Sequence, residues 1–284
     1  MPLQANTYYF ATTGNDSNPC SIAQPCKTVG AVNYSSGDTL LALDGVDFGA
    51  GNQLNFGGNI TIDGGAHGAF YTFAATVGAY AINLVGNLNA TIRNVTLVCN
   101  CGGGGIGIVL SGGSVTLENV TVVDLNGSAT GIYATLAGGA SLHLNRVTIL
   151  GQGSGITASN SGGTTPFSLE AENVTVDVAG NGATVTDGNA VFRNSRFVNP
   201  APSGTGVGFL VSKTTPSLLL DTCAFQGLAY GLVSEAGATV RISNSEFTGN
   251  NFGIFGSGAV ISYRNNVFAG NGNDGSPMLS TSLK

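Results

Sequence analysis

The sequence predicts an all-β protein wound as a parallel β-helix, in which three short strands make up each coil. Three observations predict this fold: the composition, a repeat of 21 to 28 residues, and apolar residues at matching positions of the repeats. Gly accounts for 45 of the 284 residues, whereas Lys and Arg together number only nine and Met only two. Such a scarcity of helix formers, with β-branched runs between Gly, Asn and Ser turns, is typical of strands rather than helices.

Overall charge and hydropathy exclude several classes of protein. The net charge of −6 and the pI of about 4.6 argue against a basic groove for nucleic acid. No apolar run approaches the ~20 residues that a membrane-spanning helix needs. Hydrophobic residues make up 42% of the chain, which is too many for a disordered protein. We therefore expect neither a nucleic-acid partner nor insertion into a membrane.

One motif recurs through the chain: two apolar residues that alternate with other residues, followed by an anchor that is usually Asn. Successive anchors are 21 to 28 residues apart, and a degenerate copy precedes them at Gly64. The anchors are Asn94, Asn119, Arg146, Asn173, Asn194, Thr222, Asn244 and Asn265. A repeat of this length with strands and no helix predicts a solenoid of about nine to eleven coils.

Residues at the same distance from each anchor form columns when the coils stack ~4.8 Å apart. The positions two and four residues before the anchor are apolar in every copy, so we expect them to face the core, including Ile261 and Tyr263 of the last copy. Three residues after the anchor stand Leu97, Val122, Ile149, Val176, Phe197, Phe225, Phe247 and Phe268. The last four predict a stack of Phe rings inside the coil. A third strand follows a Gly, at Gly107, Gly131, Gly155, Gly208, Gly231 and Gly253.

The anchor residue itself predicts a tight corner between two strands. Such a corner often needs a positive φ, which Asn tolerates better than most residues. Stacked Asn side chains can also hydrogen-bond from one coil to the next. The Asn-Val-Thr form of several anchors also matches a glycosylation sequon, although a corner residue explains the pattern on its own.

Two segments resemble known β-helix proteins. The run from Tyr8 to Thr28, with Gly-Asn-Asp-Ser-Asn-Pro before Cys20, resembles the opening of many secreted pectin-lyase-like proteins, as does the later Gly37-Asp-Thr-Leu. The run from Tyr263 to Gly275 resembles the ending of bacterial right-handed parallel β-helix repeat proteins without an assigned activity. The resemblance covers nearly the whole chain and implies a right-handed coil. It implies architecture rather than chemistry, because one fold hosts many functions.

The resemblance also implies a short N-terminal cap helix over Lys27–Tyr34, which closes the open end of the core. We expect three parts in the chain. Residues 1–37 form an N-terminal strand and cap, residues 38–268 form the parallel β-helix, and residues 269–284 form a C-terminal tail.

The five cysteines favour an oxidising compartment. Cys20 and Cys26 bracket a loop in the cap region at a spacing that suits a small disulfide. Cys99 and Cys101 either form a tight bridge or bind a metal, but two thiols without a nearby His are a weak metal signal. Cys223 falls in an inward column and predicts a buried free thiol. The first five residues do not resemble a signal peptide, so a secreted, periplasmic or cell-surface location is inferred from the fold and the disulfide.

A charged column lies one residue before the anchors, on the outward side of the strand. It reads Asp63, Arg93, Glu118, Asn145, Glu172, Arg193, Asp221, Ser243 and Arg264. Opposite charges fall on adjacent coils at Asp63–Arg93, Arg93–Glu118, Glu172–Arg193 and Arg193–Asp221, and Arg146 falls between Glu118 and Glu172. The first interpretation is a ladder of surface ion pairs that fixes the register of the coils, each pair contributing ~0.2–1 kcal/mol.

The second interpretation is a carbohydrate site on the same sheet. His143 and Glu170 lie three residues before their anchors and should meet Glu172 on successive coils. A polysaccharide lyase needs a base and a cation near the substrate carboxylate, and a glycoside hydrolase needs two carboxylates about 5–9 Å apart. The candidate catalytic residues are His143, Glu170 and Glu172, and the candidate binding residues are Glu118, Arg146 and Arg193.

Two functions therefore compete. The favoured hypothesis is a secreted or surface-exposed β-helix with a structural or adhesive role, or with weak glycan binding. The alternative is a polysaccharide lyase or glycoside hydrolase that acts on an extended glycan along the parallel sheet. The chain has no Trp for sugar stacking and none of the Asp-Asp, Asn-Thr-Asp or Arg-x-Pro-x-x-Arg runs of the enzymes it resembles. We expect no cofactor and no metal. The oligomeric state, including a module of a larger fibre, is left open.

A third, weaker interpretation is ice binding through an outward column of four threonines, Thr96, Thr121, Thr148 and Thr175. A second rank of Thr is missing beside them.

Overall fold

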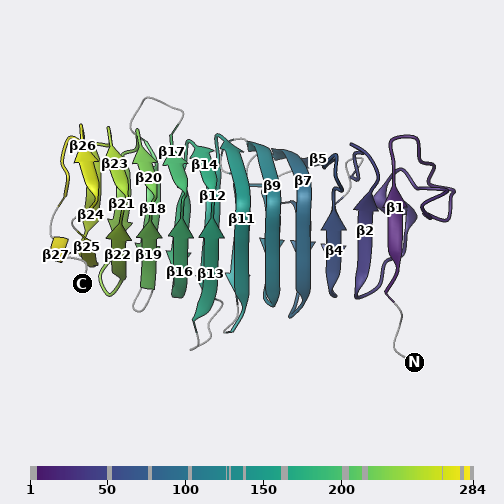
Figure 1. Cartoon of the computed structure of the whole chain (residues 1–284), viewed down its shortest axis with the longest axis horizontal. Coiled ribbons are helices and arrows are strands. Elements are labelled where there is room, and N and C mark those ends of the chain that lie inside the picture. Colours follow the sequence, from purple (N-terminus) through teal and green to yellow (C-terminus); the bar gives the residue numbers. More distant parts are fainter. Residues whose placement is uncertain are drawn as a thin grey trace.

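The computed structural model shows an elongated stack of strands in which β1 lies near one end and β26 and β27 near the other (Figure 1). The structure describes residues 5–49, 53–75, 79–101, 104–125, 127, 129–136, 139–160, 166–199, 205–212, 217–263, 265–275 and 278–281. All pairings between named strands are parallel in the described part, and each strand pairs with a strand from the next coil.

The strands fall into three faces, one strand of each coil on each face. The first face contains the strands before the corner: β1 (Thr7–Phe10), β2 (Asp38–Ala42), β4 (Ile60–Asp63), β7 (Asn89–Cys101), β9 (Ser114–Leu125), β11 (Ser141–Gly151), β13 (Phe167–Glu172), β16 (Gly188–Arg193), β19 (Ser217–Asp221), β22 (Thr239–Ser243), β25 (Ala259–Tyr263) and β27 (Met278–Thr281).

The second face follows the corner. It contains β5 (Ala69–Ala75), the second halves of β7, β9 and β11, and then β14 (Thr175–Val178), β17 (Arg196–Val198), β20 (Ala224–Gln226), β23 (Glu246–Thr248) and β26 (Val267–Ala269). The third face is a separate sheet: β3 (Leu54–Phe56), β6 (Tyr80–Leu84), β8 (Ile106–Leu110), β10 (Thr130–Leu136), β12 (Ser154–Asn160), β15 (Ala183–Thr186), β18 (Val207–Ser212), β21 (Tyr230–Ser234) and β24 (Phe252–Gly256). The predicted coil of three strands is confirmed.

The corner between the first and second faces has the predicted left-handed backbone. Seven of the predicted anchors have φ between 50° and 58°, from Asn94 to Asn244. Thr222 adopts it at 56° although its side chain is β-branched, which marks a strongly constrained position. Several anchor amides also bond between coils, as expected: Asn119 Nδ2 donates to Asn94 Oδ1 at 3.0 Å, and Asn265 Nδ2 donates to Asn244 Oδ1.

Apolar columns fill the interior, and the predicted Phe stack is present. The rings of Phe197, Phe225, Phe247 and Phe268 stack in that order with centroids 4.7–5.0 Å apart. In the late coils, the Gly at or just before the start of the third-face strand packs against this stack, as at Gly182, Gly208, Gly231 and Gly253. A Cβ on Gly231 would come within 2.7 Å of the Phe247 ring, so close packing explains the Gly there.

The predicted cap helix over Lys27–Tyr34 is wrong. The segment contains only a single turn of 3-10 helix, η1 (Val29–Ala31), with no side-chain hydrogen bond at its N-cap Thr28. Gly30 and the β-branched residues around it favour extended backbone, and the Val29 N–H donates instead to Phe48 O. The open edge of β1 is covered by the loop that contains Cys20 and Cys26. The Tyr9 N–H donates to Cys20 O, and the Cys26 N–H donates to Tyr9 O.

The last coil departs from the predicted columns. Val240 pairs with Val260 and Ile242 pairs with Ser262, so Ser262 faces the core and the inward placement of Ile261 and Tyr263 is wrong. One extra residue is accommodated at this corner, because the second-face register is restored at Phe247 and Phe268. The Asn266 side chain supports the altered corner by donating to Ile242 O and accepting from the Ser245 N–H. Arg264 of the predicted charged column lies outside the described residues.

Candidate functional site

The first face brings the candidate residues together as the column arithmetic predicts. His143 on β11 pairs in register with Glu170 on β13, and Glu172 pairs with Arg193 on β16. On the other side, Asn145 of β11 pairs with Glu118 of β9. Because alternate residues on these strands are buried, the candidate side chains point outward over the four successive coils of β9, β11, β13 and β16.

Of the four opposite-charge pairs predicted on adjacent coils, Asp63–Arg93 alone forms an ion pair within the described residues, at 2.7 Å. His143 Nδ1 lies 3.7 Å from Glu170 Oε2, with side chains 46% and 62% exposed. Arg146 from the corner column donates to Glu118 at 2.7 Å. Glu172 and Arg193 are exposed and face each other in register, but make no ion pair within the part of the chain that is described. The ladder is therefore incomplete, and it leaves a carboxylate and a guanidinium exposed side by side.

Two acids of the charged column, Asp63 and Asp221, accept several hydrogen bonds. Burial would raise the pKa of Asp63, but hydrogen bonds from the Gly65 N–H, Arg93 and Asn94 outweigh it and hold the pKa below its ordinary value. Hydrogen bonds from Asn244 at 2.9 Å and Ser243 at 2.7 Å lower the pKa of Asp221. Both carboxylates therefore stabilise the stacking of coils.

A hollow of about 320 Å³ adjoins the charged residues on the same face. Thr116 on its rim pairs with His143, so the hollow continues directly into the charged part of the sheet. It is lined by Gly37, Asn59, Ile60, Thr61, Asn89, Ala90, Thr91, Ser114 and Thr116. The lining consists largely of hydroxyl and amide groups, and the sequence analysis missed it. The sequence signal for this hollow was a row of polar residues at or just before the starts of β4, β7 and β9, namely Asn59, Asn89 and Ser114.

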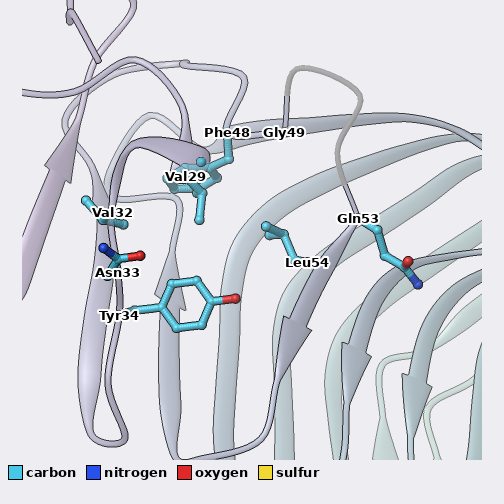
Figure 2. A pocket seen from close by; sticks show the side chains of 9 residues that line it. Val29, Val32, Asn33, Tyr34, Phe48, Gly49, Gln53 and Leu54 are labelled. Atoms are coloured by element: carbon cyan, nitrogen blue, oxygen red, sulfur yellow. The ribbon is translucent and has the colours of Figure 1, made fainter. Parts of the chain in front are cut away.

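A second hollow of about 320 Å³ lies near the N-terminal end (Figure 2). Val29, Phe48 and Leu54 give it apolar walls, while Asn33 and Gln53 add amide groups at its edge. Its lining contains no carboxylate and no imidazole, so it offers no acid–base pair for catalysis.

The cysteines behave largely as predicted. Cys20 and Cys26 form a disulfide. Cys99 is also disulfide-bonded and fully buried, while the side chain of Cys101 lies outside the described residues. Cys223 is a free buried thiol whose pKa burial raises to about 12, so it is unsuited to nucleophilic chemistry. No group of three or more His, Cys, Asp or Glu side chains gathers as metal ligands in the described ranges.

Comparisons with known proteins agree with this architecture. A family model described as the right-handed β-helix region matches residues 130–282. Among solved structures, a GH136 lacto-N-biosidase from Eubacterium ramulus superimposes with a TM-score of 0.63 at 12% identity, covering 98% of this chain and 67% of its own. A rhamnogalacturonan lyase gives 0.58 at 12% identity, covering 98% and 87%. The pectate lyase Pel9A gives 0.52 at 16% identity, covering 98% and 80%.

At these identities the solved structures show a shared fold only. A comparison with curated protein sequences finds no match. Within the described residues, none of the helical structure is long and apolar enough to cross a bilayer. The family model covers more than half of the chain, and the chain therefore belongs to the right-handed parallel β-helix family.

Proposed function

We propose that the protein binds an extended glycan along its first face, in a structural or adhesive role. The observation that carries this proposal is the hollow over β4, β7 and β9, which continues in register into the charged residues of β11, β13 and β16. Hydroxyl and amide side chains both donate and accept hydrogen bonds, which suits the hydroxyl groups of sugars. Their regular spacing along successive coils suits a ligand that is itself a repeating chain.

The charged end of the face favours an acidic glycan. Arg193 is exposed and, in the described part of the chain, makes no ion pair with either of its neighbours in register, Glu172 and Asp221. Its positive charge helps to lower the pKa of Asp221, and a sugar carboxylate would have to bind the guanidinium in competition with that acid. A charge-assisted bond of this kind is stronger than one between neutral groups. The β-helix proteins named above include a rhamnogalacturonan lyase and a pectate lyase, which supports a glycan ligand for this fold.

The solvent exposure of the candidate catalytic side chains favours binding over catalysis. A carboxyl group that serves as a general acid is usually shielded from water, because burial keeps it protonated. Glu170 is 62% exposed, and His143 beside it is 46% exposed. The described surroundings therefore provide little of the desolvation that acid catalysis needs.

Cleavage of the glycan is the second candidate function, and the contact of His143 with Glu170 favours it. Glu170 and Glu172 lie two residues apart on one strand, which separates their backbones by about 6.6 Å. Carboxyl pairs of glycosidases fall in the same range. In this function His143 acts as the base of a lyase, or the two carboxylates act as the pair of a hydrolase.

We also propose that the protein is exported to the cell surface or beyond. The Cys20–Cys26 disulfide supports this proposal, because structural disulfides persist in oxidising compartments. Alkylation of intact cells without reductant, followed by mass spectrometry, should leave Cys20 and Cys26 unmodified. Alkylation of both would contradict export.

The proposed glycan binding is tested by affinity electrophoresis in gels that contain polygalacturonate or neutral galactan. Arg193→Gln should weaken retardation by polygalacturonate about tenfold, the loss expected for one charge-assisted contact. Arg196→Gln is the matched control, because Arg196 lies on the second face and bonds to Gln226. Equal retardation of the two variants, or no retardation of the unmodified protein by any glycan, would contradict the proposal.

Turnover is tested on the same glycans by following unsaturated products and reducing ends. Activity that disappears in Glu170→Gln or His143→Ala would establish cleavage. Binding without turnover would leave the adhesive function.

A further inference from the structure

The outward side chains of the third face differ in polarity along its length. In β12 and β15 the outward positions carry hydroxyl groups, at Ser154, Thr157 and Thr184, whereas β8 and β10 before them present Ile106, Val109, Thr130 and Tyr133. In the last three coils every corresponding position is apolar. One rank reads Val207, Tyr230 and Phe252, and the neighbouring rank reads Leu210, Val233 and Phe255. Threonine fits an outward strand position equally well, so strand formation alone does not call for this change.

Three of these side chains form a cluster of rings on the surface. Tyr230 and Phe252 stack with centroids 5.3 Å apart and planes inclined by 13°. The Phe255 ring lies 5.0 Å from Tyr230 and 5.5 Å from Phe252, inclined to them by 49° and 61°. Phe255 is 48% exposed, although it is held on two sides by the other rings. The cluster is therefore both fixed in place and open to solvent.

The size of this apolar patch and its lack of charge restrict the kind of ligand that it could bind. Five of the six side chains are half-buried, so the patch offers well under the ~800 Å² that each partner contributes to a stable protein interface. None of the six positions is charged, and Asn251 and Ser257 at the strand ends add amide and hydroxyl groups, while the acid Glu235 follows β21. A small ligand with an apolar face and a hydroxyl-bearing edge matches this arrangement.

We propose that the ring cluster of Tyr230, Phe252 and Phe255 is a second binding site, for a neutral saccharide. The C–H groups on one face of a pyranose ring carry partial positive charge and pack on the negative face of an aromatic ring. The third-face rings supply this platform, and the lining of the first-face hollow contains no aromatic ring. The site is distinct from the first-face glycan site and does not depend on it.

The test uses affinity electrophoresis in gels that contain neutral polysaccharides, namely hydroxyethylcellulose, xylan and galactan. Phe255→Ala should weaken retardation by at least one of them about tenfold, the effect of losing a stacking ring. Phe70→Ala is the matched control, because Phe70 is 49% exposed on the second face. Glu172→Gln on the first face should leave this binding unchanged, which separates the two sites.

Equal retardation of Phe255→Ala and Phe70→Ala, or no retardation by any of the three polysaccharides, would overturn the proposal. Sedimentation velocity of the unmodified protein and Phe255→Ala tests the other occupant. A dimer that Phe255→Ala dissociates would assign the cluster to contact between copies of the chain, and would also overturn it. Unchanged circular dichroism and melting temperature should accompany both variants, because both side chains are exposed.

Discussion

The early and late coils build the same corner in two different ways. In the early coils, β7, β9 and β11 run through the corner as single strands of 13, 12 and 11 residues, with a Val after each anchor. From β13 onward each of these strands is divided into two shorter ones, and from the following coil the position after the anchor holds Ser195, Cys223 or Ser245 in place of Val. The two kinds of corner differ in the groups that accept hydrogen bonds from the backbone N–H groups at the corner.

In the late coils, serine side chains accept hydrogen bonds from these backbone N–H groups. The Val174 N–H donates to Ser195 Oγ at 3.2 Å, and the Cys223 N–H donates to Ser245 Oγ at 3.1 Å. The Ser245 hydroxyl in turn donates to Ser243 O at 2.8 Å. Buried backbone groups need partners, so a polar residue in the core is stable here because it satisfies the corner. The same coil shape therefore forms with either of two kinds of corner, one with Val after the anchor and one with a hydrogen-bonding Ser.

The candidate site spans the junction of these two regions. His143 belongs to the last undivided strand, whereas Glu170, Glu172 and Arg193 belong to divided ones. The first-face register is continuous across the junction, which keeps the outward side chains aligned.

The largest expected effect concerns the core columns of the two regions. Phe225→Ala should lower the free energy of unfolding by about 3–5 kcal/mol, because it leaves a cavity between two stacked rings. Val122→Ala, at the same column in an early coil, should cost about 1–3 kcal/mol, since it removes less buried surface. Urea denaturation measures both, and an equal cost would contradict the importance of the Phe stack.

The next effect tests the side-chain corner directly. Ser245→Ala should cost about 1–3 kcal/mol, because the buried Cys223 N–H loses its acceptor. Ser245→Val, which places the early-coil residue in a late coil, should not restore the loss. Ser257→Ala is the exposed control and should change stability by no more than about 0.5 kcal/mol. A neutral Ser245→Val would show that the two corners are interchangeable.

Low pH should lower the stability of both the early and the late coils. The folded pKa of Asp63 and of Asp221 is held below the ordinary value, so the unfolded chain binds protons more readily. Each carboxylate therefore contributes stability that is fully present above the ordinary Asp pKa and is lost as the pH falls through the folded pKa. Asp63→Asn and Asp221→Asn should each flatten the acid limb of a stability-versus-pH curve. An unchanged limb in both would contradict these pKa shifts.

The smallest effect is expected from the surface ion pairs. Arg146→Gln should cost at most about 1 kcal/mol, because Arg146 and Glu118 are 56% and 39% exposed and solvent screens them. Thermal unfolding at low and high salt measures the loss, which should shrink with salt. A larger cost independent of salt would mean that Arg146 stabilises the corner in another way.

Much of this organisation was predictable because it depends on periodicity. The register of His143 with Glu170, the left-handed anchors and the Phe stack all follow from counting residues between repeats. The slip at Ser262 was not predictable, because one extra corner residue shifts a strand while its apolar pattern still looks acceptable. The cap helix failed because the resemblance implied a helix that the local sequence around Gly30 does not favour.

The site was predictable in position but not in shape. Sequence columns place Glu172 opposite Arg193, yet whether long side chains meet depends on rotamers that periodicity does not determine. The hollow over Thr91 and Thr116 depends on how far neighbouring segments stand from the sheet. The ring cluster at Phe255 was missed because the third strand was followed only through its buried positions.

A pair of matched double variants tests most directly whether the first face holds the glycan. Both are made in a Phe255→Ala background, which removes the proposed third-face site. Thr91→Ala with Thr116→Ala alters the lining of the hollow, whereas Thr121→Ala with Thr148→Ala alters threonines of the second face. Titration calorimetry with oligogalacturonate should show about tenfold weaker binding for the first pair alone. Equal affinities of the two double variants would contradict glycan binding by the first face.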